Sequence, residues 1–391
     1  MKKKKKILVY CQHVLGIGHL ARVAAMVKKL QTFEVTLVLG GPRTQIVFPA
    51  GVDIVQLPGL QMDAEFSGLQ PVDSGASLTA IKAQRRERLL HLVELLQPDI
   101  VLIELFPFGR CGFRFELDPL LDYVKTHLPA CRVVCSVRDI LVERENKKKF
   151  EQRAVERLNG FFDLLLVHAD PKIITFDQTF SRMENIKIPI RYTGYIVEKS
   201  SRKGGLRLRG LLGSGRDEQL VVVSAGSGSV GYRLLESALA AHAALVRKQG
   251  KKLRLQLFSG PYLSKEHFAR LLDLAGPGGV VERFSNRFSD WLAAADLSLS
   301  MGGYNTTMNV VAAGCPALIF PFSQNREQRL RAEQLSAHVP LEILEQWDLR
   351  PERLAEKMDE MLKQKKYAPE IALNGAEETA ALLGQEAGLA G

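Results

Sequence analysis

Two glycine turns between an apolar strand and a helix predict phosphate binding. The first is Gly302-Gly303, which follows the apolar run 295–299 and precedes a helical pattern closed by Gly314. Without side chains here, an anion can approach the backbone while the amides and hydroxyls of the next turn point at it. The expected ligands of this turn are Gly302, Gly303, Asn305, Thr306 and Thr307.

The second glycine turn, 224–231, follows the apolar run 220–223 and adds Ser227 and Gly228 as candidate phosphate ligands. Such a turn can bind phosphate, or it can let two domains approach closely. It is not a Walker loop, because no Gly-Lys-Ser/Thr follows it.

His19 is the side chain that the sequence places best for a general base. It stands beside Gly18 at the start of an expected helix, shortly after the apolar strand 6–11. A helix N-terminus lowers the pKa of an imidazole, and a neutral imidazole can accept a proton. A dinucleotide-binding fingerprint fits poorly, since Ala21 replaces its third glycine and no acidic residue ends the next strand. A structural role for His19 stays open from these residues.

Other polar side chains follow the ends of expected strands in the N-terminal half. Glu104 and Asp139 are weaker candidates for the base, and Arg110 and Arg138 are candidates for contacting an anionic acceptor. In a parallel sheet the carboxyl ends of the strands meet at one edge, where ligands bind. Alternatively, Arg138 and Asp139 pair with each other, and the aromatic residues around Arg110 pack in the core.

Strands and helices alternate along the chain, which predicts an α/β fold with doubly wound, mostly parallel sheets. Because 391 residues exceed one typical core, we expect two domains. A basic stretch rich in serine and glycine is typical of an interdomain connection. The predicted boundaries are an N-terminal domain at 1–195, a linker at 196–218 and a C-terminal domain at 219–391. The polar stretches 61–77 and 323–328 are expected to be loops, the first either disordered or a functional lid.

The composition indicates a globular protein of the cytoplasm. No run approaches the roughly 20 apolar residues of a membrane span, and the apolar run after the N-terminal lysines is too short for a signal peptide. Five cysteines form no disulfide framework. Much of the net charge of +10 comes from Lys2 to Lys6, either a solvated tail or an attachment to an anionic membrane surface at its inner face. No nucleic-acid module is present, so nucleic acid is not an expected partner.

The chain resembles the GT-B glycosyltransferases with a MurG-type (glycosyltransferase family 28-like) C-terminal domain, and most closely their uncharacterised predicted branch. The resemblance covers nearly the whole chain. It rests on the order and spacing of several short motifs, of which no single one is decisive. These motifs are Gly16-Ile17-Gly18-His19-Leu20-Ala21-Arg22, Pro107-Phe108-Gly109-Arg110, Ser136-Val137-Arg138-Asp139-Ile140-Leu141, Tyr192-Thr193-Gly194-Tyr195, Gly302-Gly303-Tyr304-Asn305-Thr306 and Arg326-Glu327-Gln328.

This resemblance implies two Rossmann-like domains that face a central cleft. The C-terminal domain would hold a nucleotide-sugar, UDP-linked in MurG-type enzymes, and the N-terminal domain a hydroxyl acceptor, lipid-linked or polymeric. Transfer would invert the anomeric centre, with no metal and no other cofactor. The donor-binding residues would then also include Gly18, Phe284, Asn309, Glu327 and Gln328. Asn309 replaces a glutamate usual in the family, which weakens the expected bond to the ribose.

Three other functions compete with glycosyl transfer. A nucleotide-sugar hydrolase of this fold would use water as the acceptor, an epimerase would act on the sugar itself, and a catalytically weak protein would only bind the nucleotide-sugar.

Overall fold

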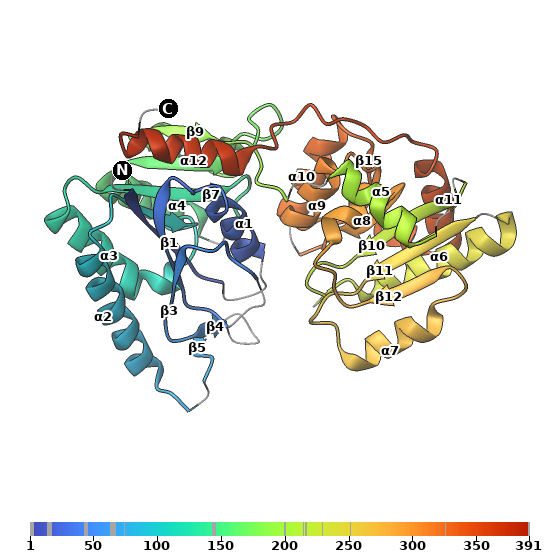
Figure 1. The fold of residues 1–391 in the computed structure, drawn as a ribbon, viewed down its shortest axis with the longest axis horizontal. Helices are drawn as coiled ribbons and strands as arrows, with labels where there is room; N and C mark the ends of the chain where they lie inside the picture. The colour runs from blue at the N-terminus through green and yellow to red at the C-terminus, as the bar shows by residue number, and fades with distance from the viewer. Residues whose placement is uncertain are drawn as a thin grey trace. The chain divides into compact units, whose positions relative to one another are not determined.

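A computed structural model describes residues 4–13, 18–42, 46–62, 68–73, 75–142, 146–198, 201–213, 215, 217–228, 230–250, 252–324 and 326–389. The chain divides into two compact units (Figure 1), of which unit 1 contains residues 1–196 and 372–391 and unit 2 contains residues 197–371. Among the described residues, no helix is long and apolar enough to cross a membrane.

Unit 1 is built on a parallel sheet of seven strands in the order β3-β2-β1-β6-β7-β8-β9. Its central strands are continuous apolar runs because helices cover both faces. The strands are β1 (Lys5–Cys11), β2 (Phe33–Leu39), β3 (Val52–Gln56), β6 (Ile100–Glu104), β7 (Arg132–Arg138), β8 (Leu164–His168) and β9 (Ile190–Tyr192).

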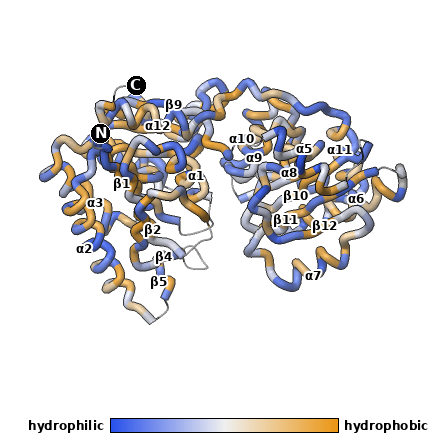
Figure 2. The backbone as a smooth tube through the Cα atoms, in the orientation of Figure 1, coloured by the Kyte–Doolittle hydropathy of each residue, from blue (hydrophilic) through white to orange (hydrophobic). Residues whose placement is uncertain are grey.

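Alternate residues of β1 reach different helices. Ile7 and Val9 pack in a core with Leu20 of the helix α1 (Gly18–Val27) and Leu383 of the helix α12 (Gly375–Glu386). The hydroxyl of Tyr10, on the opposite face, donates to Glu116 of the helix α3 (Arg114–His127). Hydrophobic and hydrophilic residues accordingly alternate along helices such as α2 and α3 (Figure 2). The helices of unit 1 are α1 (Gly18–Val27), α2 (Leu78–Leu96), α3 (Arg114–His127), α4 (Lys147–Phe161) and α12 (Gly375–Glu386), with three short 3-10 turns at Cys111–Phe113, Phe176–Gln178 and Met183–Asn185.

Part of the predicted loop 61–77 forms an antiparallel hairpin of β4 (Leu60–Met62) and β5 (Leu69–Pro71). Residues 63–67 and 74 of that loop lie outside the described residues.

Unit 2 carries a parallel sheet of six strands in the order β12-β11-β10-β13-β14-β15. These strands are β10 (Gln219–Ser224), β11 (Leu253–Phe258), β12 (Gly279–Glu282), β13 (Leu297–Met301), β14 (Ala317–Phe320) and β15 (Leu341–Ile343). The helices are α5 (Arg202–Leu211), α6 (Tyr232–Gln249), α7 (Lys265–Leu274), α8 (Phe288–Ala294), α9 (Tyr304–Ala312), α10 (Arg326–Ser336) and α11 (Pro351–Met361), with a 3-10 turn at Gln346–Leu349. Two parallel, Rossmann-like halves confirm the predicted fold class.

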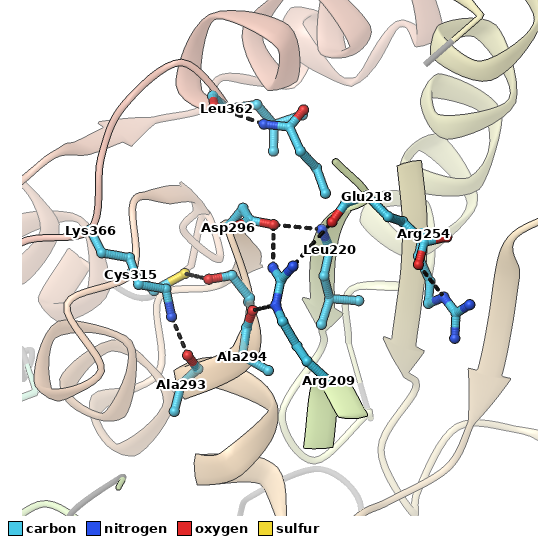
Figure 3. A network of polar contacts seen from close by, with 12 residues as sticks. Arg209, Glu218, Leu220, Arg254, Ala293, Ala294, Asp296, Cys315, Leu362 and Lys366 are labelled. Atoms are coloured by element: carbon cyan, nitrogen blue, oxygen red, sulfur yellow. Dashed lines mark hydrogen bonds and ion pairs between the residues drawn. The ribbon is translucent and has the colours of Figure 1, made fainter. Parts of the chain in front are cut away.

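The predicted linker is not an open connection, because it contains α5. Arg209 of α5 donates to the carbonyl of Ala294 at 2.8 Å and to the carboxylate of Asp296, which also accepts the amide of Leu220 at 2.7 Å (Figure 3). Gly205 lies so close to α8 that an added Cβ would stand 2.7 Å from the Ala293 carbonyl carbon. These contacts place residues 197–218 in unit 2.

The predicted C-terminal boundary also differs from the structure, because the chain returns to unit 1 at Ala372. The amide of Ala372 donates to Asp170 Oδ2 at 2.8 Å, and the amide of Tyr195 donates to the carbonyl of Ala372 at 2.8 Å. Helix α12 then supplies Leu383 to the core beneath α1. The apolar face of α12 is thus buried in the first unit.

Candidate active site

His19, Arg22 and Glu104 form a buried cluster at the carboxyl edge of the unit 1 sheet. Strands β1 and β6 are neighbours, so Glu104 at the end of β6 lies beside the start of α1. His19 Nδ1 stands 2.7 Å from Glu104 Oε1, and the Arg22 guanidinium donates to the same oxygen. Only 18% of the His19 side chain and 1% of the Glu104 side chain are exposed.

The cluster fixes the tautomer of His19. An ionised carboxylate only accepts hydrogen bonds, so the 2.7 Å contact requires the proton on Nδ1. Nε2 is then left as the proton acceptor. The second oxygen, Glu104 Oε2, is buried and has no hydrogen-bond partner among the described residues.

The charges around the cluster keep His19 neutral and Glu104 ionised. Burial lowers the pKa of His19 to about 4. The positive charges of Arg110 and Arg22 also lower this pKa, whereas the Glu104 carboxylate raises it. Burial alone would raise the pKa of Glu104, but His19, Arg22 and Arg110 outweigh it and hold that pKa below its usual range. His19 is therefore unprotonated at neutral pH and able to accept a proton.

Arg110 belongs to this cluster through the loop that follows β6. Its charge acts on both His19 and Glu104, and its buried Nε has no partner among the described residues. Phe108 of the same loop makes edge-to-face contacts with Phe176 and Phe180 at 5.0 and 5.1 Å. The aromatic residues therefore pack in the core, whereas the charge of Arg110 acts on the cluster.

Arg138 ends β7 at the same edge of the sheet, and Asp139 follows it. Asp139 is fully buried, and its Oδ1 accepts the amide of Ile140 at 2.8 Å, which gives this carboxylate a structural task. Arg138 is half-buried and is paired in register with His168 of β8. Burial lowers the pKa of His168 to about 3, and its ring nitrogens contact Ser136 Oγ at 2.6 Å and Thr193 Oγ1 at 2.9 Å.

In unit 2 the two glycine turns lie side by side at the ends of β10 and β13. An added Cβ on Gly231, which has a φ of 101°, would stand 3.1 Å from Met301 Sδ. An added Cβ on Gly228, which has a φ of 87°, would stand 2.4 Å from the carbonyl oxygen of Ser259. The amide of Tyr262 donates to the carbonyl of Ser227 at 3.0 Å, so the second turn is braced by the loop after β11.

Gly302 and Gly303 have different tasks. A Cβ on Gly302 would meet Gln328 Cβ at 3.0 Å and Ile319 Cγ2 at 3.3 Å, so this glycine permits close packing of α10. A Cβ on Gly303 would meet no atom within 4 Å. Gly303 is the N-cap of α9 and brings no side-chain cap. The open approach to the helix N-terminus is therefore at Gly303.

Three buried hydroxyls accompany this turn. Ser224 and Ser300 are paired in register at the ends of β10 and β13, and Thr307 lies one turn into α9. Each hydroxyl oxygen is buried without a hydrogen-bond partner among the described residues. Buried polar groups normally have partners, so these three hydroxyls are candidates for contacting a bound ligand. Asn305 and Thr306, half-buried in the first turn of α9, complete the set.

Glu327 and Gln328 lie in the first turn of α10 and not in a loop. Gln328 Oε1 accepts the amide of Phe322 at 2.9 Å, and Glu327 is buried. Asn309 Oδ1 accepts the amide of Glu198 at 3.2 Å, which leaves its amide nitrogen as a donor. Phe284, beyond the end of β12, is 59% exposed.

Some predicted residues lie outside the described part of the chain, namely Gly16 and Ile17 of the His19 motif and Lys2 and Lys3 of the basic run. Lys5 forms an ion pair with Asp99 at 2.8 Å, and Lys6 Nζ donates to the carbonyl of Leu96 at 3.0 Å. These two lysines are part of β1, so they belong to the fold and not to a solvated tail. Within the described residues, no three His, Cys, Asp or Glu side chains gather as metal ligands would.

Residues 220–385 match the family described as the glycosyltransferase family 28 C-terminal domain. Across both units the chain is similar to a solved Polygonum tinctorium UDP-glucosyltransferase (TM-score 0.67, 14% identity, 99% of this chain and 100% of that one). It is also similar to Acinetobacter baumannii MurG (TM-score 0.58, 14% identity, 97% and 99%). The chain has the GT-B fold, and its residues 220–385 resemble the family 28 C-terminal domain. The resemblance to GT-B glycosyltransferases with a MurG-type C-terminal domain, which the sequence motifs predicted, is therefore confirmed.

Two curated relatives of this GT-B chain are named UDP-N-acetylglucosamine–N-acetylmuramyl-(pentapeptide) pyrophosphoryl-undecaprenol N-acetylglucosamine transferases. The Bacillus licheniformis protein is 24% identical over 226 residues, which cover 57% of this chain and 60% of that protein. The Vibrio cholerae protein is 32% identical over 136 residues, which cover 34% and 37%. The chain thus matches less than two thirds of the length of these relatives.

The sequence interpretation of the GT-B site missed Arg22, Ser224 and Ser300 as functional residues. Arg22 follows His19 by three residues on one helix, and this spacing places the two on one face. Ser224 and Ser300 are the last polar residues of two apolar runs, and the pairing of those strands is what makes them neighbours.

Proposed function

We propose that this chain is an inverting glycosyltransferase that moves a sugar from a nucleotide-sugar to an acceptor hydroxyl. The observation that carries the proposal is the 2.7 Å contact between His19 Nδ1 and Glu104 Oε1, which leaves Nε2 of a neutral imidazole as a base. The family 28 domain at 220–385 supports the nucleotide-sugar as the donor.

In the proposed reaction the acceptor hydroxyl gives its proton to His19 Nε2. The acceptor oxygen attacks the anomeric carbon from the face opposite the diphosphate, so a new carbon–oxygen bond forms as the bond to the diphosphate breaks. The electron pair of the broken bond leaves with the diphosphate. Glu104 stabilises the imidazolium that forms, as an ionised carboxylate does when it orients a catalytic histidine.

We propose that the diphosphate binds at the start of α9. The hydroxyls of Ser224, Ser300 and Thr307 are buried without a partner among the described residues, the space beside Gly303 is open, and a helix N-terminus favours an anion. Such preformed donors stabilise charge that develops on a leaving group. We therefore propose that no metal is needed, and turnover should persist in excess chelator. Loss of turnover that a divalent cation restores would refute metal independence.

We propose a UDP-linked donor, because the curated relatives are named as transferases of UDP-N-acetylglucosamine. The exposed Phe284 ring offers a stacking surface for the base, and the Asn309 amide nitrogen a donor for the ribose. Glu327 is assigned to the sugar or ribose hydroxyls. UDP should protect the chain against heat, since a ligand that binds only the folded state raises its stability. Equal protection by every nucleotide would refute this assignment.

The substitution His19→Ala tests the proposed base. Turnover of the nucleotide-sugar should be lost while the nucleotide affinity measured by titration calorimetry stays close to that of the original chain. Unchanged turnover would remove His19 from this role. Release of free sugar at the full turnover rate without any acceptor would instead identify a hydrolase.

We propose that the chain works in the cytoplasm and reaches an anionic membrane surface through Lys2 and Lys3. The described cysteines are all free thiols, in keeping with a reducing compartment. Deleting Lys2 to Lys6 would damage β1, so the test is the replacement of Lys2 and Lys3 by glutamine. Reduced binding to vesicles of anionic lipid is expected, and unchanged binding would refute the attachment.

A further inference from the structure

Unit 1 contains a cavity of about 640 Å³ that the proposed reaction does not use. It lies between the loop after β6, the start of α3 and the helix α4. Four of its lining side chains are basic, namely Arg114, Lys149, Arg153 and Arg157, and none of the described lining residues is acidic. Lys149, Arg153 and Arg157 are spaced by four residues, so they form one stripe of α4.

The positive charge of this cavity is only partly neutralised. Asp118 lies next to the cavity and is shared by Arg114 at 3.1 Å and Arg157 at 3.0 Å. Lys149 and Arg153 have no acidic partner among the described residues. Among the described residues these four cations share one carboxylate, which leaves a net charge of +3 that a di- or trianion would largely or fully balance. A single carboxylate ligand would leave most of that charge uncompensated.

The rest of the lining is largely apolar. Phe106, Pro107, Phe150 and Ala154 stand among the basic residues, and Phe106 and Ala154 are buried beneath the surface. An apolar group attached to the anion would contact these side chains and exclude water from them. The cavity thus combines two kinds of surface that one amphipathic ligand can satisfy.

The loop after β6 separates this cavity from the base. Arg110 acts on His19 and Glu104, whereas Phe106, Pro107 and Cys111 line the cavity. None of the residues assigned to the proposed reaction lines it. A ligand in the cavity would therefore contact residues on either side of Arg110 in the sequence, Pro107 and Cys111, without occupying the His19 cluster.

We propose that this cavity binds a phosphate- or diphosphate-bearing ligand with an adjoining apolar group. Guanidinium groups bind phosphate oxygens through paired, charge-assisted hydrogen bonds, and the uncompensated charge matches a phosphate in size and sign. The proposal goes beyond glycosyl transfer and does not depend on it.

Cys111 provides a direct readout of binding. It is the exposed one of the five cysteines and lines the cavity, while the other four are buried. Its reaction with N-ethylmaleimide should slow severalfold in millimolar inorganic pyrophosphate, compared with sodium chloride of equal ionic strength. Octyl phosphate below its micelle concentration should protect at lower concentration than pyrophosphate. Protection only by vesicles of phosphatidic acid, and not by vesicles of phosphatidylcholine, would assign the phosphate to a lipid headgroup.

Two variants of α4 form a matched pair. Lys149→Gln removes a cation that lines the cavity and should weaken protection by about tenfold, as expected for a lost charge-assisted bond. Lys148→Gln removes the same charge from an exposed residue that does not line the cavity, and protection should be unchanged. Equal losses in both variants, or labelling that no phosphate compound slows, would overturn the proposal. Both residues are exposed on a helix, so the variants should fold.

Discussion

Replacing Glu104 by glutamine tests the arrangement of the base. The amide keeps the size of the side chain, and its oxygen can still accept from Arg22. That oxygen takes the place of Oε1, which contacts both Arg22 and His19 Nδ1, so the tautomer of His19 is kept. What is lost is the negative charge that stabilises the imidazolium.

The structure gives the size of this effect. His19 Nδ1 and Glu104 Oε1 are 2.7 Å apart, so the two charge centres lie roughly 4 Å from each other, and at an effective dielectric constant near 20 they attract by about 4 kcal/mol. That energy is available to the imidazolium form in the transition state only. Its loss corresponds to a fall in kcat of about 10³-fold.

The assay is release of the nucleotide diphosphate at saturating donor, together with titration of the nucleotide. The rate should fall by the stated factor while the dissociation constant stays the same, because the nucleotide is assigned to unit 2. Asp139→Asn is the control, since it neutralises a second buried carboxylate at the same sheet edge and should cost less than tenfold. A Glu104→Gln enzyme within tenfold of the original rate, or an Asp139→Asn enzyme that is the more damaged of the two, would refute the reasoning.

Three further predictions concern pH and the glycine turn. The value of kcat/KM should fall as the pH drops through about 4, where His19 takes up a proton. Arg110→Gln should shift this fall in kcat/KM to higher pH, because it removes a charge that lowers the pKa of His19. An unshifted pH profile would refute the effect of Arg110 on His19. Gly303→Ala should weaken nucleotide binding and leave the midpoint of thermal unfolding unchanged. Gly302→Ala places a methyl group against Gln328 and should lower that midpoint. The opposite result for the two variants would refute the roles assigned to these glycines. Below its ordinary pKa of 6.5, His168 is protonated in the unfolded chain but stays neutral in the folded one down to about 3. Stability is therefore lost as the pH falls through this range, by about 1.4 kcal/mol per pH unit in urea titrations, and His168→Gln should flatten the slope.

Apolar periodicity was sufficient to predict most elements. The predicted apolar runs 6–11, 220–223 and 295–299 overlap β1, β10 and β13. These segments carry long apolar patterns with clear ends, and the parallel sheets bury both faces of their strands.

Helices α5 and α10 escaped prediction because their sequences contradict the usual signals. α5 carries Gly204 and Gly205, which disfavour a helix, yet close packing against α8 requires the second of them. α10 is strongly polar, and it is held in place by a buried arginine, Arg331, whose guanidinium lies 5.2 Å from the Tyr304 ring centroid. In both helices tertiary contacts outweigh local preference.

The candidate site was predictable only in part. The carboxyl ends of parallel strands lie at one edge of a sheet, so the alternation of strands and helices predicted that His19 and Glu104 lie near each other. The choice between Glu104 and Asp139 required side-chain geometry, since both lie at the carboxyl ends of strands in the same sheet. The roles of these residues stay predictions.

Proton NMR of the first sugar product tests the central claim most directly. The chain would be supplied with an α-linked UDP-sugar, and the anomeric configuration of the sugar that first appears, transferred or released, would be recorded before mutarotation. The account predicts a β product from the original chain and none from His19→Ala. An α product, or a β product formed at the original rate by His19→Ala, would contradict it.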